Sequence, residues 1–195
     1  MLGGDQRRIR LAYSLQFTLR GTPVIRYGEE IGMGDDLSLP GRLAVRNPMQ
    51  WSSGPAGGFS TSDKLYRPVH ADGPYGYRTV NVADQRHDPD SLYSWVAQVI
   101  RVRRKSPELG WGEWRILDVD DPCVLAIETR WRGHQMITLH NLSAEPAKVH
   151  LPDDPDEATE DERMRQVLGD ADPPYSPGRE ITLGRYGFRW LRRTD

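Results

Sequence analysis

Cysteine is nearly absent from this sequence, since Cys123 is the only one among 195 residues. A single thiol cannot form an intramolecular disulfide, and it cannot supply a cysteine-based metal site. Lysine is also rare, because only three of the 26 basic residues are lysine. The net charge of −2 gives no electrostatic reason to expect nucleic acid or an anionic membrane as a partner.

Long apolar runs are missing as well. No stretch approaches the roughly 20 residues of a membrane span. The first residues, MLGGDQRRIR, carry charge where a signal peptide needs an apolar stretch. The sequence therefore predicts a cytoplasmic location and no membrane partner. With 37% hydrophobic and 28% charged residues, the composition is typical of a globular chain with one large domain or two small ones.

The first part of the chain indicates α/β structure. Asp5 suits an N-cap and Gly21 suits the position after a helix, and apolar residues recur between them at helical spacing. This pattern predicts a helix over about residues 6–20. The following run, Thr22–Tyr27, is short and contains β-branched residues, so we expect a buried parallel strand there.

A second helix is predicted to begin after Asp90-Ser91 and to end at Ser106-Pro107. After Gly112 the apolar period changes from helical to alternating, which predicts a small antiparallel β-sandwich. Arg132-Gly133-His134 is expected to connect a hairpin. The predicted strands are Trp114–Leu117, Val124–Trp131, Gln135–Asn141, Ala147–Leu151, Met164–Leu168, Glu180–Leu183 and Tyr186–Leu191, with Tyr186, Phe188 and Trp190 on one face.

Residues 34–90 show little periodicity and carry many Gly, Pro, Asp and Ser, and a loop of this length is usually functional. Its aromatic side chains could line a sugar site, or they could anchor the loop to its scaffold. The sequence favours neither interpretation. The aromatic residues are Trp51, Phe59, Tyr66, Tyr75 and Tyr77. A later acidic run at 152–163, PDDPDEATEDER, lacks EF-hand spacing and is expected to be a solvated loop.

Three stretches carry a family pattern: GTPVIRYGEEIGM at 21–33, RNPMQW at 46–51 and NVADQRHDPDSLYSW at 81–95. The first resembles the eighth-strand motif of glycoside hydrolase family 13, the α-amylase family, with matches at Gly21, Pro23, Gly28 and Glu30. Arg26 departs from the tyrosine often found in this motif. The second resembles the R-x-P-M-Q-W motif of α-glucosidases and trehalose synthases, and the third is similar to the entry into the last barrel helix. The stretch GMGDDLSLPGRLAVRNPMQW leans toward trehalose synthase and its close α-glucosidase relatives.

This resemblance implies a (β/α)8 barrel followed by a β-sandwich, with α-glucan chemistry. The expected fold class is therefore α/β plus all-β: the C-terminal part of a barrel over residues 1–112 and a sandwich over residues 113–195. Enzymes of this family retain anomeric configuration. They need an aspartate nucleophile, a glutamate acid/base and a third aspartate in an N-H-D motif.

Neither a G-x-R-x-D nor an N-H-D motif is present in the sequence. His87-Asp88 does not replace the latter, because Gln85-Arg86 precede it. The chain resembles the family from the helix after the seventh barrel strand onward. We therefore expect the C-terminal part of a longer enzyme, or a shortened reading frame that begins at an internal Met1. No catalytic residue is assigned, and whether this chain is itself an enzyme stays open.

The adjacent carboxylates of Glu29 and Glu30 invite comparison with the acid and nucleophile of a glycosidase. On an extended segment, neighbouring side chains point to opposite sides. They would not both face one bond at the roughly 5–5.5 Å that retaining chemistry needs. A supporting role at the pocket rim, as in an ion pair, fits them better. Tyr27 and Gln50 are assigned to the same supporting group, and Gln50 with Trp51 is expected to hold the loop rather than touch sugar.

Arg46 is the one substrate-binding residue that we assign. A guanidinium can bind sugar hydroxyls or pair with a buried carboxylate. The resemblance implies a place at the glycone subsite, facing a carboxylate that this chain lacks. The histidines show no ligand spacing with one another, so no metal and no cofactor are expected.

Two hypotheses of different class follow. In the first, the chain is a portion of a trehalose synthase-like or α-glucosidase-like enzyme and is inactive alone. An α-glucoside would then be its substrate only within the full enzyme, and an N-terminal barrel fragment is a possible partner. In the second, the sandwich acts as a non-catalytic carbohydrate-binding or interaction module.

Overall fold

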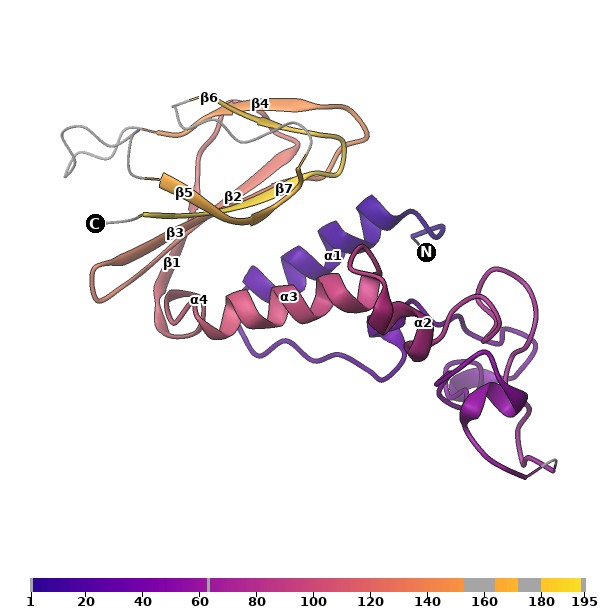
Figure 1. The fold of residues 1–195 in the computed structure, drawn as a ribbon. Coiled ribbons are helices and arrows are strands. Elements are labelled where there is room, and N and C mark those ends of the chain that lie inside the picture. The colour runs from indigo at the N-terminus through magenta and orange to yellow at the C-terminus, as the bar shows by residue number, and fades with distance from the viewer. Residues whose placement is uncertain (1, 63, 153–163, 172–179, 194–195) are drawn as a thin grey trace. The chain divides into compact units, whose positions relative to one another are not determined.

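The computed structural model describes residues 2–62, 64–152, 164–171 and 180–193 (Figure 1). Most of the acidic run, residues 153–163, lies outside them. Backbone contacts divide the chain into two compact units. Unit 1 combines Met1–Pro23 with Val99–Asp195, and unit 2 comprises Val24–Gln98. The domain boundary expected near residue 112 stays a prediction. The two units are defined by backbone contacts, whereas that boundary was expected from the sequence pattern and the family resemblance.

Unit 1 contains two antiparallel sheets, which Figure 1 shows as separate layers. The larger sheet has the order β1-β2-β3-β7-β5, and the smaller sheet pairs β4 with β6. The strands are β1 Glu113–Leu117, β2 Val124–Trp131, β3 His134–Asn141, β4 Ala147–His150, β5 Met164–Gly169, β6 Glu180–Leu183 and β7 Phe188–Arg193. The alternating pattern after Gly112 therefore predicted each of these strands to within two residues at either end.

Apolar side chains from both sheets form one core. Ala126 and Leu139 contribute from the larger sheet, and Val149 and Leu183 contribute from the smaller one, each at most 1% exposed. Because strand side chains alternate between faces, the inward residues of β2 and β3 recur at every second position. Two antiparallel sheets that share a core in this way form a small β-sandwich.

The hairpin between β2 and β3 has a two-residue turn. Trp131 pairs with His134, and the intervening Arg132 and Gly133 have φ angles of 49° and 84°. Two consecutive positive φ angles define the type I′ turn, whose twist suits a tight hairpin. The predicted connection is confirmed. The predicted start of β7 at Tyr186 is wrong, because Tyr186 has a φ of 52° and lies in the turn before the strand.

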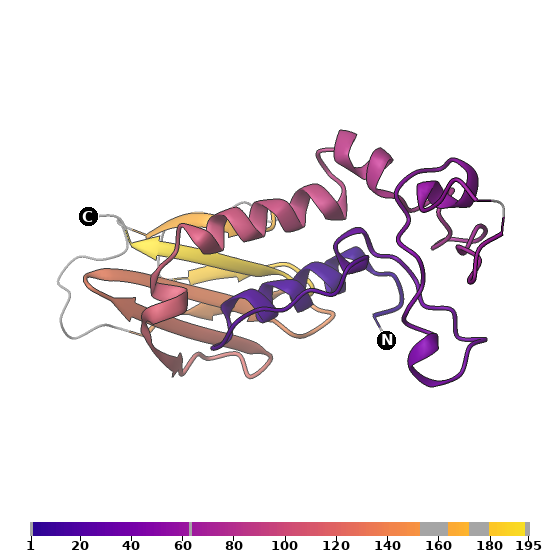
Figure 2. The ribbon, with the colours of Figure 1, turned by 90° about the horizontal axis from the view of Figure 1, so that it is seen from below.

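Helix α1, Gln6–Thr18, packs against the other face of the larger sheet (Figure 2). Trp190 is fully buried, and its indole N–H donates to Ser14 Oγ at 2.8 Å. The same hydroxyl oxygen lies 2.9 Å from His140 Nε2. Burial lowers the pKa of His140 to about 4. The helix is thus attached to the sheet through a polar contact that apolar side chains surround.

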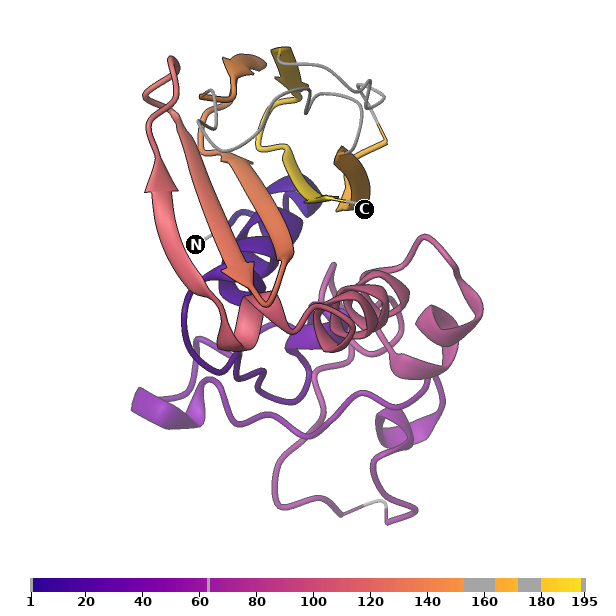
Figure 3. The ribbon, with the colours of Figure 1, turned by 90° about the vertical axis from the view of Figure 1, so that its left-hand side faces the viewer.

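Two further helices precede the first strand, and the boundary between the units falls within the first of them. Helix α3, Leu92–Arg104, begins after Ser91, whose hydroxyl accepts from Ser94 N–H. Near its end, Arg103 donates to the main-chain carbonyls of Phe17 and Gly21. The short helix α4, Glu108–Trp111, was not predicted. Its buried Glu108 accepts from Arg192 Nε at 2.8 Å, so α4 is tied to β7. Figure 3 shows α4 beside the end of β2.

Unit 2 consists mostly of irregular segments. It contains α2, Val82–His87, and three short 3₁₀ helices, η1 Glu29–Ile31, η2 Gly41–Leu43 and η3 Pro55–Gly58. Its apolar cluster comprises Ile31, Met33, Met49 and Val82. None of these short helices was predicted from the sequence.

The predicted strand at Thr22–Tyr27 is wrong. The segment has no regular secondary structure up to Arg26, and Val24 is 74% exposed. A parallel strand needs a neighbour to complete its ladder. Among the described residues no strand pairs with this segment.

Candidate functional site

A cavity of about 470 Å³ opens in unit 2. Its volume falls in the range of small-ligand sites, which is roughly 300–1,000 Å³. Aromatic and arginine side chains line it, namely Tyr27, Trp51, Phe59, Tyr66, Arg46 and Arg67. Asn47, Pro48, Met49 and Leu65 complete the wall, so none of the described residues that line the cavity is acidic.

The loop aromatics divide between the two interpretations that the sequence left open. Trp51 and Phe59 are about half exposed, Tyr66 is fully exposed, and all three line the cavity. Tyr77 is buried, and its main-chain N–H donates to His70 O at 2.9 Å. Tyr77 therefore anchors the loop, whereas the first three present aromatic surface to the cavity.

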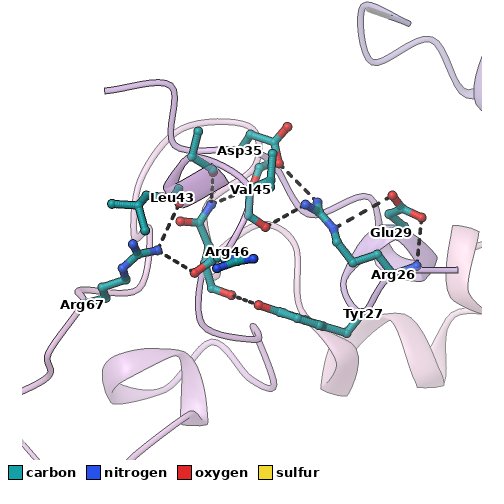
Figure 4. Close-up of polar contacts among 11 residues, drawn as sticks. Arg26, Tyr27, Glu29, Asp35, Leu43, Val45, Arg46 and Arg67 are labelled. Atoms are coloured by element: carbon teal, nitrogen blue, oxygen red, sulfur yellow. Dashed lines mark hydrogen bonds and ion pairs between the residues drawn. The ribbon is translucent and has the colours of Figure 1, made fainter. Parts of the chain in front are cut away.

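Arg46 lies on the cavity wall with an exposed side chain (Figure 4). Its main chain is bonded on both sides: its N–H donates to Leu43 O at 3.2 Å, and its carbonyl accepts from Arg67 Nη1 at 2.8 Å. Its guanidinium has no hydrogen bond or ion pair with any residue in the described part of the chain. The backbone is thus held while the charged group is available at the cavity.

Glu29 and Glu30 do not lie on an extended segment, so that expectation is wrong: they belong to the 3₁₀ helix η1. A 3₁₀ helix has three residues per turn, so neighbouring side chains diverge by about 120°. Glu29 accepts from Arg26 N–H at 3.1 Å and lies 4.0 Å from Arg26 Nε. One oxygen of Glu30 is buried without a hydrogen-bond partner among the described residues. Neither carboxylate lines the cavity.

Gln50 and Tyr27 contact the main chain of the loop. Gln50 is 1% exposed, and its amide donates to the carbonyls of Tyr75 and Val80 at 3.1 and 2.5 Å. The Tyr27 hydroxyl donates to Asn47 O at 2.9 Å, while its ring lines the cavity. Gln50 thus joins distant parts of the loop, and Tyr27 contributes to both the wall and its support.

Sequence reasoning missed Arg67, which brings a second positive charge to the wall. It lies 21 residues after Arg46, and no local spacing connects the two. The spacing of the histidines in the sequence did not predict a metal site. Across residues 2–62, 64–152, 164–171 and 180–193, no group of three His, Cys, Asp or Glu side chains has the arrangement of a metal site.

Comparisons with known proteins agree with the motifs. The family model described as alpha amylase, catalytic domain, matches residues 1–112, and that of the sucrose hydrolase-like C-terminal domain matches residues 133–192. The chain is 37% identical over 192 residues to the trehalose synthase of Thermus thermophilus, covering 96% of this chain and 20% of that relative. It is 35% identical to the trehalose synthase of Pimelobacter sp. (strain R48), covering 100% of this chain and 35% of that relative. The chain thus spans between a fifth and about a third of the length of these relatives.

Solved structures show the same fold. Trehalulose synthase MutB from Pseudomonas mesoacidophila MX-45 superposes with a TM-score of 0.75 at 22% identity, over 97% of this chain and 40% of that one. Trehalose-6-phosphate hydrolase of Bacillus licheniformis gives a TM-score of 0.78 at 19% identity, over 100% and 40%. In the described part of the chain, no helix has the length and apolarity to cross a membrane. Because the catalytic-domain model matches more than half of its residues, the chain belongs to glycoside hydrolase family 13, the α-amylase family, and resembles the C-terminal part of its trehalose synthase-like members.

Proposed function

We propose that the chain is the C-terminal portion of an α-glucan-active enzyme of the trehalose synthase or α-glucosidase type. In that enzyme, residues 1–112 complete the (β/α)8 barrel and residues 113–195 form the sandwich domain. The observation that carries this proposal is the available guanidinium of Arg46 at an aromatic cavity, none of whose described lining residues is acidic. A glucosyl unit needs donors for its hydroxyls and an apolar surface for its ring, and this wall offers both.

The described residues of the wall supply binding groups but no carboxylate that could act as acid, base or nucleophile. Retaining glycosidases need two carboxylates about 5–5.5 Å apart. Since neither Glu29 nor Glu30 lines the cavity, both carboxylates come from another segment. An unpaired arginine facing that segment would stabilise a carboxylate there in its ionised form. The chain alone is therefore inactive.

An N-terminal barrel fragment is the expected partner of this chain. The run Thr22–Tyr27 has no strand beside it among the described residues. Pairing with a strand of the N-terminal fragment would complete its ladder and give it the buried setting that its sequence favours. Mixing the two fragments would then restore activity that neither has alone.

The first test is incubation of the pure chain with maltose, trehalose and an aryl α-glucoside. We expect no turnover of any of the three. Turnover that survives further purification and is lost in Glu29→Gln or Glu30→Gln would overturn the proposal. Inspection of the coding DNA upstream of Met1 for an N-H-D motif tests the same idea independently.

Exposed aromatics in unit 1 favour one other candidate, a non-catalytic carbohydrate-binding module. Trp111 is 78% exposed, and Trp114 and Ile116 are 39% and 62% exposed on one face of β1. Aromatic faces on a sheet surface can stack on sugar rings. Retention of the chain on immobilised amylose, lost in Trp111→Ala, would support this candidate.

A further inference from the structure

Three consecutive main-chain carbonyls around Arg46 each accept a hydrogen bond from a side chain elsewhere in unit 2 (Figure 4). The bonds are Arg26 Nη1 to Val45 O at 2.7 Å, Arg67 Nη1 to Arg46 O at 2.8 Å, and Tyr27 hydroxyl to Asn47 O at 2.9 Å. Loop carbonyls at the surface are commonly left to water. Here the segment 45–47 is held at every residue.

The donors approach this segment from two separate parts of the sequence. Arg26 and Tyr27 precede it, whereas Arg67 follows it. Arg67 also donates to Leu43 O at 3.0 Å, so one guanidinium joins two carbonyls of the same turn. Both bonds come from one nitrogen, Nη1, whose two N–H groups lie in the fixed plane of the guanidinium.

Arg26, Tyr27 and Arg67 together form a clamp on residues 45–47, and this clamp is itself anchored. Arg26 lies 3.3 Å from Asp35 Oδ1 and 4.0 Å from Glu29 Oε1. These contacts restrict the arginine that holds Val45. The carboxylate of Glu29 therefore supports the wall through Arg26 rather than by touching the cavity.

We infer that Arg26, Tyr27 and Arg67 are positioning residues for Arg46, an inference that rests on the proposed function of that residue as a glucosyl ligand. Their three hydrogen bonds fix the backbone from which the guanidinium enters the cavity. A displacement of about 1 Å in a binding group can lower a rate by about a hundredfold. The clamp keeps the guanidinium within the reach that its sugar or carboxylate partner requires.

Arg67 lines the cavity as well, so its charge alone could explain an effect of removing it. The two explanations predict different outcomes for Arg67→Lys. Lysine keeps the positive charge, but its side chain is shorter and its ammonium donors are not fixed in a plane, so it does not place N–H groups where Nη1 joins Leu43 O and Arg46 O. If the bridge matters, lysine will not replace arginine. If only the charge matters, it will.

The test uses the full chain and amide hydrogen exchange followed by NMR. The reporter is the N–H of Arg46, which donates to Leu43 O at 3.2 Å. We expect Arg67→Ala and Arg67→Lys to speed its exchange by about tenfold, and Tyr27→Phe to speed it by about threefold. Arg42→Ala is the matched control, because the side chain of this exposed arginine in η2 forms no hydrogen bond or ion pair with the described residues. It should change the exchange rate of the Arg46 amide by less than about twofold.

Unchanged exchange of the Val82 amide, which donates to Gln50 O at 3.0 Å in the same unit, shows that unit 2 is folded in each variant. Wild-type exchange at Arg46 in Arg67→Ala, or in Arg67→Lys, overturns the clamp whatever the chain's function. In an enzyme that contains this chain, we expect Arg67→Ala and Arg67→Lys to lower kcat/KM about tenfold. If Arg46→Ala lowers activity but both Arg67 variants do not, positioning is overturned and the proposed function stands. If Arg46→Ala has no effect either, the proposed function fails.

Discussion

The two compact units differ in the kind of hydrogen bond that stabilises each of them internally. In unit 1, main-chain groups bond to main-chain groups along β1-β2-β3-β7-β5, and side chains are left to fill the core. In unit 2, polar side chains bond to main-chain carbonyls of irregular segments, as Gln50 and Asn81 do. A ladder survives the loss of any one side chain, whereas a loop bonded by side chains does not. Substitutions should therefore act through packing in unit 1 and through lost hydrogen bonds in unit 2.

The largest expected effect of packing is at Trp190. Its side chain is fully buried between α1 and the sheet. We expect Trp190→Ala to lower the free energy of unfolding by about 3–5 kcal/mol, measured by urea denaturation. Trp190→Phe keeps an aromatic ring but loses the N–H that bonds Ser14, so its loss should be clearly smaller. Equal losses for both variants would mean that the hydrogen bond, and not packing, dominates in unit 1.

The next largest effect should be a dependence of the stability of unit 1 on pH. The pKa of His140 is about 4 because the side chain is buried, against 6.5 for the free group. Between these values the unfolded chain binds the proton more tightly, so stability is complete above about pH 6.5 and is lost as pH falls toward 4. The pKa difference corresponds to about 3 kcal/mol for this group. Urea denaturation across this pH range should show that the free energy of unfolding depends less on pH in His140→Gln than in the wild type. The exposed His134→Gln should keep the wild-type dependence.

Loss of the Arg46 guanidinium should affect activity rather than stability. In an enzyme that contains this chain, we expect Arg46→Ala to lower kcat/KM by about ten- to a hundredfold, because a hydrogen bond to a charged group is worth about 1.5–3 kcal/mol. Arg42→Ala, in the preceding 3₁₀ helix η2, should leave kcat/KM nearly unchanged. Small and equal effects of both substitutions would show that Arg46 is an ordinary loop arginine.

The smallest expected effect is at Gln50, and it should be local. Gln50→Leu keeps a side chain of similar size but leaves the carbonyls of Tyr75 and Val80 without their donor. We expect this substitution to lower the free energy of unfolding by about 1–3 kcal/mol. Faster amide exchange should appear in residues 75–82 and not in β2 or β3. The control is Gln98→Leu at an exposed position of α3 in the same unit, and a similar change there would show that the effect does not come from the hydrogen bonds of Gln50.

Local patterns predicted much of unit 1. Apolar alternation is a property of neighbouring residues, so it placed Val124–Trp131 and Glu180–Leu183 at their observed bounds. Helical spacing likewise placed α1 and α3. The failures depend on something outside the local pattern. Thr22–Tyr27 has the composition of a strand but no described neighbour to pair with, and the positive φ of Tyr186 is unusual for a tyrosine.

The candidate site shows the same division. The RNPMQW motif pointed to Arg46, and the cavity contains that residue. Nothing near Arg67 in the sequence connects it to Arg46, because their bond joins two parts of a loop with no repeating geometry. The conformation predicted for Glu29 and Glu30 was wrong for a related reason. A 3₁₀ turn, flanked by Gly28 and Gly32 with positive φ angles, takes the place of the predicted extended segment.

The contact of Trp190 with Ser14 also bears on the order in which the protein folds. The two residues are 176 positions apart, and β7 pairs with β3 across a separation of about 50 residues. The β2–β3 hairpin closes through a two-residue turn, so it can form within microseconds. The first helix must wait for a strand that is synthesised far later, and ln kfold falls as such distant contacts increase. We therefore expect the hairpin to form early and the docking of α1 to be among the last steps.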